Sequence, residues 1–170
     1  MTLFRPFLER WRLTALLASL GMLAIAHGFQ TFGGFAPCAL CLRQREVYWA
    51  AAAVAAAGFL IVRLSPWRGW RILSTGLLAA IFVVGIGVAV YHAGAEWKWW
   101  PGPTACANVG GRVSVQDMTA LLQGAQIRPP ACDEAPWVFL GLSMAGWNAL
   151  ISLALAGLSL MALRLEWTRR

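Results

Sequence analysis

Long apolar runs separated by short polar segments dominate this chain. Four of these runs approach or exceed the roughly 20 apolar residues that a helix needs to cross a bilayer. They cover about residues 13–29, 43–62, 72–91 and 137–163. The second run is rich in alanine and contains Gly58, and small residues of this kind allow membrane helices to pack closely. The pattern predicts an all-α membrane protein, a bundle of four transmembrane helices.

The polar segments predict two loops on one side of this bundle, at about 30–42 and 92–136. The second is the only long polar stretch. Within it, Ser114 and Asp117 have the spacing of a helix start, and apolar residues follow on one face. We therefore expect a short helix on the membrane surface inside this loop. No repeat or linker interrupts the chain, which predicts a single domain over 1–170.

Composition agrees with a membrane protein. Hydrophobic residues make up 59% of the 170 residues and charged residues only 12%. A soluble domain of this size could not cover so much apolar surface with so few charges. Lipid is therefore the expected solvent for most of the chain.

Positive charge orients the predicted bundle. Nine arginines fall in three clusters that the four helices would bring to one face: Arg5, Arg10, Arg12, Arg63, Arg68, Arg71, Arg164, Arg169 and Arg170. Because such residues stay in the cytoplasm, we expect both termini there and both loops on the outer side. The first run is expected to remain as a helix and not to be cleaved as a signal peptide. The net charge of +7 then requires no nucleic acid partner.

All four cysteines fall in or beside the predicted outer loops. Cys38 and Cys41 form a Cys-x-x-Cys pair, whereas Cys106 and Cys132 lie far apart in the long loop. An outer bacterial face is oxidising, so disulfides are expected there. A Cys-x-x-Cys bridge closes too small a loop to stabilise much, and this favours redox exchange over a structural role. Structural disulfides and a four-cysteine zinc site remain alternatives; we predict no bound metal.

Two further polar side chains flank the predicted cysteine site. Arg45 follows Cys41 by four residues, so both share a helix face if the second helix begins there. Its guanidinium could favour a thiolate or donate to a carbonyl-bearing acceptor. Contact with lipid headgroups is the alternative role. His92, at the outer end of the third run, could equally be a capping or interfacial residue.

The ordered set of motifs resembles the DsbB family of bacterial membrane disulfide-generating enzymes. The resemblance begins with Pro37-Cys38-Ala39-Leu40-Cys41 and Arg45, and continues through Tyr91-His92, Cys106 and Cys132 to the segment Trp137–Met144. It covers essentially the whole chain, although residues 96–104 and 107–130 carry nothing that we can assign to the family pattern. The surface that docks a partner is therefore not predicted.

This resemblance implies a function, a partner and a cofactor. Proteins of this family reoxidise DsbA, a soluble periplasmic thiol oxidant, and pass its electrons to a membrane quinone. DsbA has a potential of about −120 mV, so its electrons need an acceptor more oxidising than ordinary dithiols. The resemblance implies a thiol oxidoreductase of the bacterial inner membrane that generates disulfides de novo with ubiquinone or menaquinone. It also implies that all four cysteines face the periplasm.

The resemblance also implies site roles. Cys106–Cys132 would receive electrons from the DsbA-type partner, and Cys38–Cys41 would hand them to the quinone. Arg45 would polarise a quinone oxygen and steady the Cys41 thiolate, with His92 in the same pocket. The alternatives are a paralogue that serves another thiol partner, an enzyme similar to vitamin K epoxide reductase, and a non-enzymatic membrane protein with structural disulfides.

Overall fold

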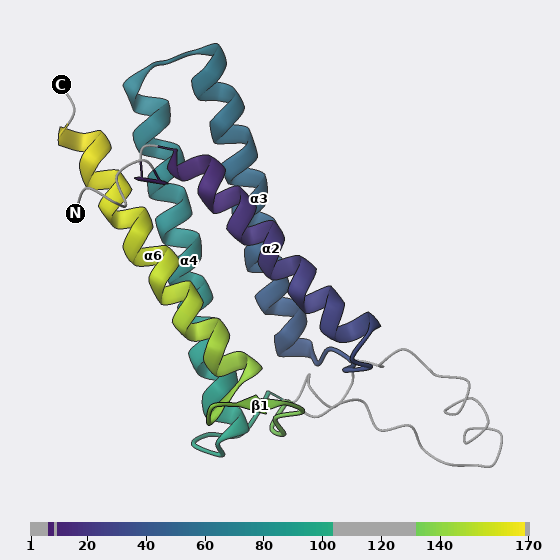
Figure 1. The fold of residues 1–170 in the computed structure, drawn as a ribbon. Helices are drawn as coiled ribbons and strands as arrows, with labels where there is room; N and C mark the ends of the chain where they lie inside the picture. Colours follow the sequence, from purple (N-terminus) through teal and green to yellow (C-terminus); the bar gives the residue numbers. More distant parts are fainter. Residues whose placement is uncertain (1–6, 9, 104–131, 169–170) are drawn as a thin grey trace, which may run out of the picture.

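A computed structural model of the protein describes residues 7–8, 10–103 and 132–168. Its long helices are α2 (Trp11–Thr31), α3 (Ala39–Leu64), α4 (Arg68–Glu96) and α6 (Met144–Thr168). All four are long and apolar enough to cross a membrane, so the predicted four-helix transmembrane bundle is confirmed. Helix α2 packs against α3, α3 packs against α4, and α4 packs against α6 (Figure 1). Cys106 and the short helix predicted after Ser114 lie outside the described residues.

Two helices extend farther toward the predicted outer side than their apolar runs. Helix α3 begins at Ala39, not at residue 43, because the side chain of Cys38 caps it by accepting a hydrogen bond from the backbone N–H of Cys41 (3.3 Å). Helix α4 continues to Glu96, where the predicted boundary was residue 91. Cys41 and His92 consequently lie on helices instead of in loops, and their positions are fixed by regular backbone.

The fourth helix begins later than predicted. A helix from residue 137 is wrong, because Val138–Phe139 (β1) and Leu142–Ser143 (β2) form an antiparallel hairpin before α6 begins. The two residues of its turn, Leu140 and Gly141, have φ angles of 50° and 78°, as the tightest hairpin turns require. The Trp147 side chain donates to the carbonyl of Phe139 (3.0 Å), which ties the hairpin to the first turn of α6.

Small residues let α3 approach its neighbours closely, as the alanine-rich run predicts. Ala51 and Ala55 are fully buried, and Gly58 faces Ser74 of α4. A methyl group on Gly58 would lie 2.6 Å from the Ser74 Cβ, a distance that real contacts do not reach. Hydrogen bonds add to this packing, because the Tyr48 hydroxyl donates to the Asn148 side chain of α6 at 2.5 Å. Backbone proximity and a buried polar contact therefore hold the bundle together.

The described arginines of these clusters lie at one end of the bundle, where α2 begins, α6 ends and the turn between α3 and α4 lies (Figure 1). Arg12 forms a buried ion pair at this end. Its guanidinium donates to Glu166 at 2.8 Å and to the Thr75 hydroxyl at 3.1 Å, and both charged side chains are over nine-tenths buried. Next to it, Trp11 donates to Ser159 at 3.1 Å. This end is therefore closed by a buried ion pair between α2 and α6.

Candidate active site

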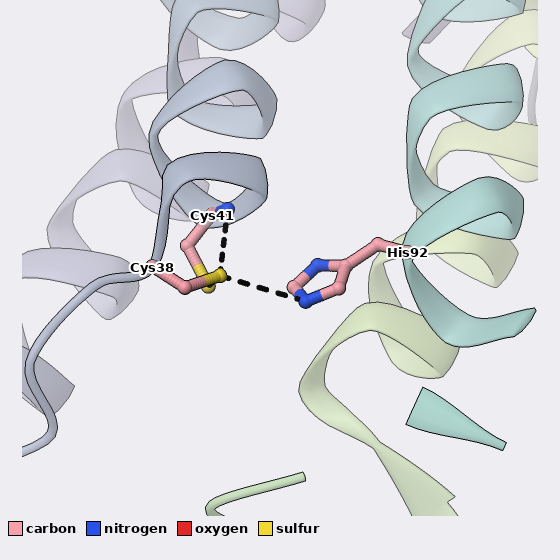
Figure 2. Close-up of side chains that lie close together, drawn as sticks. All are labelled: Cys38, Cys41 and His92. Carbon is pink, nitrogen blue, oxygen red and sulfur yellow. Dashed lines mark hydrogen bonds between the residues drawn. The ribbon is translucent and has the colours of Figure 1, made fainter. Parts of the chain in front are cut away.

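The Cys-x-x-Cys pair lies at the start of α3 (Figure 2), and this end of the bundle is opposite to the turn between α3 and α4 (Figure 1). Cys38 and Cys41 are both free thiols, and their Sγ atoms are 2.9 Å apart. This distance is longer than the 2.05 Å or so of a disulfide bond but short enough for one sulfur to donate to the other. The pair is therefore a dithiol arranged for conversion to a disulfide.

The environment of Cys38 favours its thiolate. The pKa of Cys38 is lowered to about 4, chiefly because the Cys41 thiol donates a hydrogen bond to it. Burial opposes this shift, while His92 adds to it by hydrogen bonding and by charge. The backbone N–H of Cys41, in the first turn of α3, also points at the sulfur. A thiolate is the reactive form of cysteine, so Cys38 is an activated nucleophile.

His92 reaches this sulfur from α4 (Figure 2). Its Nε2 atom lies 3.6 Å from Sγ of Cys38, and its Nδ1 atom is 3.2 Å from the Gln44 side-chain amide. The same Nε2 is 3.7 Å from Oε1 of Glu96, one helical turn farther along α4. The Glu96 side chain is only 1% exposed and accepts a hydrogen bond from the hydroxyl of Ser143. The buried Glu96 side chain, the His92 imidazole and the Cys38 sulfur are thus neighbours in space, with His92 in contact with both of the others.

Cys132 belongs to the same site. It is 1% exposed, is disulfide-bonded and packs in one buried cluster with Cys38 and Leu40. Thiol–disulfide exchange requires direct approach of a thiolate to a disulfide sulfur. The described part of the chain therefore brings an activated thiolate and a disulfide sulfur into one cluster, as a relay between two cysteine pairs requires.

An apolar pocket of about 340 Å³ opens beside Cys41. Cys41 and Arg45 both line it, but Cys38 and His92 do not, so the expectation that His92 shares this pocket is not met. Aromatic rings form much of its wall, and its polar lining also includes the Tyr48–Asn148 pair. The aromatic residues of the wall are Phe29, Phe35, Tyr48, Trp137, Phe139 and Trp147.

Arg45 is held at this pocket by α2. One guanidinium nitrogen donates to the Gln30 side chain at 2.6 Å and another to the carbonyl of Ala26 at 3.0 Å. Arginine carries five N–H donors, so donors remain for a ligand in the pocket. Cys41 and Arg45 share a helix face as predicted, since both line one cavity.

The geometry fits a redox dithiol better than a zinc site. Ligand atoms of Cys38, Cys41 and His92 lie within 4.8 Å of one another. Two thiolates on one tetrahedral zinc, with bonds of about 2.3 Å, would be about 3.8 Å apart. The observed sulfur separation of 2.9 Å is shorter and matches a hydrogen-bonded pair.

The sequence predicted most of this arrangement but missed three residues that support it. The cysteine pair, His92 and Cys132 come together, and Arg45 lines the adjoining pocket. Glu96 was not predicted, although its four-residue spacing from His92 was a signal once the helix was known to continue. Gln44 and Ser143 carried no recognisable signal, because their contacts lie on other elements.

Comparison with known proteins places the chain among disulfide bond formation proteins. The family described as disulfide bond formation protein DsbB matches residues 9–162. A disulfide bond formation protein B from Dechloromonas aromatica is 30% identical over 148 residues, 83% of each chain. A disulfide bond formation protein B from Marinobacter nauticus is 31% identical over 157 residues, which cover 91% of this chain and 90% of the relative. Because the family match covers α2, α3, α4 and most of α6, the chain belongs to the DsbB family.

Proposed function

We propose that this protein reoxidises a DsbA-type dithiol protein in the periplasm and passes the two electrons to a membrane quinone, generating disulfide bonds de novo. The observation that carries the proposal is the position of Cys41, which belongs to an activated dithiol and lines an apolar pocket beside a guanidinium. Such a pocket lies where a lipid-soluble electron acceptor can reach one sulfur, while Cys38 lies in the cluster that contains Cys132.

The pocket residues suit a quinone head group. The cavity volume of about 340 Å³ is within the range of small-molecule sites. Its aromatic walls can stack on a flat ring, and Arg45 can donate to a ring oxygen as negative charge develops there. A bound quinone would supply the capacity to accept two electrons and two protons. Cys41 and Arg45 would hold and orient it, and the apolar lining would exclude water.

In the proposed relay, Cys106 exchanges with the reduced partner because it belongs to the long polar loop. The electrons then reach Cys38 and Cys41 through exchange with Cys132, whose sulfur is buried in the same cluster as Cys38. The protein would act in the bacterial inner membrane with both termini in the cytoplasm and the cysteines on the periplasmic side. The described arginines of the three clusters lie near the start of α2, the end of α3, the start of α4 and the end of α6, and these helix ends gather at the opposite end of the bundle, which supports this orientation (Figure 1).

Two cysteine variants test the relay. Exchange proceeds through a mixed disulfide, which is trapped when the resolving thiol is removed. Cys132→Ser should therefore accumulate a covalent adduct between its Cys106 thiol and a DsbA-type protein supplied in the disulfide form, whose S–S bond breaks as the mixed disulfide forms. Cys41→Ser should retain partner exchange at Cys106 but abolish quinone reduction. Non-reducing gels followed by peptide mapping, with quinone absorbance measured in parallel, report both results.

A partner protein whose active-site cysteines are replaced by serine is the matched control and should form no adduct. An adduct mapped to Cys38 or Cys41 would contradict the proposed order of electron transfer. Quinone reduction by Cys41→Ser at the parent rate would contradict the role of this sulfur. A protein that reduces no quinone with any reduced thioredoxin-fold partner would be a structural membrane protein instead of an oxidase.

A further inference from the structure

Glu96 is a buried acid that the proposed electron relay does not use. Its side chain is 1% exposed, and a buried carboxylate is unfavourable unless it is paired and hydrogen-bonded. The Ser143 hydroxyl from β2 donates to one oxygen. Within the described residues, the only basic group at ion-pair distance from Glu96 is His92, whose Nε2 lies 3.7 Å from Oε1. The burial of Glu96 is thus best satisfied when His92 carries a positive charge.

His92 lies between two acidic groups that compete for the same proton. Its Nε2 faces Sγ of Cys38 at 3.6 Å and Glu96 at 3.7 Å, whereas Gln44 contacts the other ring nitrogen. In a serine or cysteine protease the carboxylate binds the nitrogen remote from the nucleophile and fixes the tautomer. Here the carboxylate and the sulfur approach one nitrogen, so Glu96 acts through its charge.

An imidazolium at His92 donates from both ring nitrogens, so the Gln44 amide, whose Nε2 atom lies 3.2 Å from Nδ1, must turn its oxygen toward the ring. Cys38 and Cys41 are the titratable groups that face it from α3, and Gln44 and Ser143 are neutral. Cys132 packs nearby in a disulfide, which does not titrate. Lys98 and Asp133 pair with each other at the surface. Within the described part of the chain, Glu96 is therefore the carboxylate placed to stabilise an imidazolium at His92.

Oxidation of the dithiol releases two protons that need separate routes. One Sγ–Sγ bond forms, and two electrons leave for the quinone, which ends as quinol. Cys41 lines the pocket and can give its proton to the quinone oxygen directly. Cys38 does not line the pocket, and His92 Nε2 is the base that contacts its sulfur. The imidazolium then returns this proton to solvent, and solvent supplies the second proton of the quinol.

We propose that His92 is the acceptor of the Cys38 proton and that Glu96 is the positioning residue that stabilises the imidazolium formed by this transfer, while Ser143 holds the Glu96 carboxylate in place. This inference rests on the proposed dithiol oxidation, but the state of Cys38 can be measured without quinone or partner. Failure of the quinone reaction and failure of the role of Glu96 are therefore distinguishable.

The test is the pH dependence of Cys38 alkylation by iodoacetamide, resolved by peptide mass spectrometry. A Cys106→Ser/Cys132→Ser background leaves only the Cys38–Cys41 dithiol. Without further change, the rate should reach its plateau by about pH 6, because the Cys38 pKa is about 4. Glu96→Gln keeps a hydrogen-bonding group of the same shape but removes the charge. It should move the midpoint upward by about one pH unit, which lowers the rate at pH 4 about fivefold.

Two variants separate charge from simple packing. Ser143→Ala removes the hydroxyl contact but keeps the carboxylate, so the midpoint should move less than in Glu96→Gln. In a His92→Ala background, Glu96→Gln should cause no further shift, because the charge acts through the imidazole. A midpoint in Glu96→Gln that stays in place or moves downward overturns the proposal. A shift of equal size in Ser143→Ala, or one that persists without His92, also overturns it.

Infrared spectra of the unsubstituted protein give an independent measurement if Glu96→Gln does not fold. With ¹³C-labelled glutamate, no carboxylic acid band should appear at pH 7, because the other buried glutamate in the described part of the chain, Glu166, is paired with Arg12. A labelled carboxylic acid band would show that Glu96 is neutral and cannot stabilise an imidazolium. This result would overturn the proposal without any substitution at the site.

Discussion

Replacement of Arg45 by methionine gives the most direct test of the pocket as a quinone site. The side chain remains long and apolar, but the guanidinium and its donors are lost. A hydrogen bond to a charged group contributes about 1.5–3 kcal/mol, which corresponds to a change of about tenfold to a hundredfold. We expect the KM for a soluble quinone analogue to rise by this factor, measured from quinone absorbance with a reduced DsbA-type protein as electron donor.

Arg43 offers a matched control two residues away. Its side chain is 70% exposed and pairs with Glu46, so Arg43→Met removes the same charge from the same helix outside the Arg45 pocket. The KM should then change by less than about twofold, as is typical of exposed ion pairs. Arg45→Lys should be intermediate, since lysine keeps the charge but loses the planar fork of donors.

Arg45 also ties α3 to α2, and this second role needs its own control. Gln30→Leu removes the 2.6 Å contact to the guanidinium but leaves the charge at the pocket. If Arg45 acts on the quinone, Gln30→Leu should raise the KM much less than Arg45→Met does. An unchanged KM in Arg45→Met, or an equal rise in Arg43→Met, would refute the assignment of Arg45 to the quinone site.

Two further predictions concern the bundle itself. Gly58→Ala should lower the free energy of unfolding in detergent by about 1–3 kcal/mol relative to Gly76→Ala, because the new methyl group would press on Ser74. Gly76 is the control, since it has open space around it. Equal midpoints of thermal unfolding for the two variants would show that α3 and α4 move apart freely to accept the methyl group. A reporter active only in the cytoplasm should work when fused after the last residue but not when inserted at Gly102, and activity at Gly102 would contradict the proposed orientation.

The four helices could be predicted because lipid imposes a length and an apolar composition on each of them. Their ends could not, because local contacts determine them. Cys38 caps α3 with its own sulfur, and the hairpin before α6 depends on two residues with positive φ angles. Hydropathy alone does not distinguish Val138–Ser143 from the helix that follows, since both are largely apolar.

Some residues of the candidate site could likewise be predicted from the sequence, and others could not. Its cysteines and Arg45 were predicted, because their types and order resemble a known family. Glu96 and Ser143 were not, because their contact joins residues 47 positions apart and depends on the extra turn of α4. Arg12 was predicted as part of an arginine-rich end, but its buried ion pair was not predicted, since its partner Glu166 lies 154 residues away.

The Arg12–Glu166 pair has a consequence for how the chain is made. At a synthesis rate of about 5–20 residues per second, Glu166 emerges from the ribosome about 8–30 s after Arg12. Arg12 is the second residue of α2, so its long side chain can reach the interface before its partner exists. The first helix can therefore insert early with Arg12 directed to the headgroups, and the ion pair can become buried only after the last helix is made. A chain that stops before α6 lacks this pair, so closure of this end of the bundle requires that synthesis has reached the last helix.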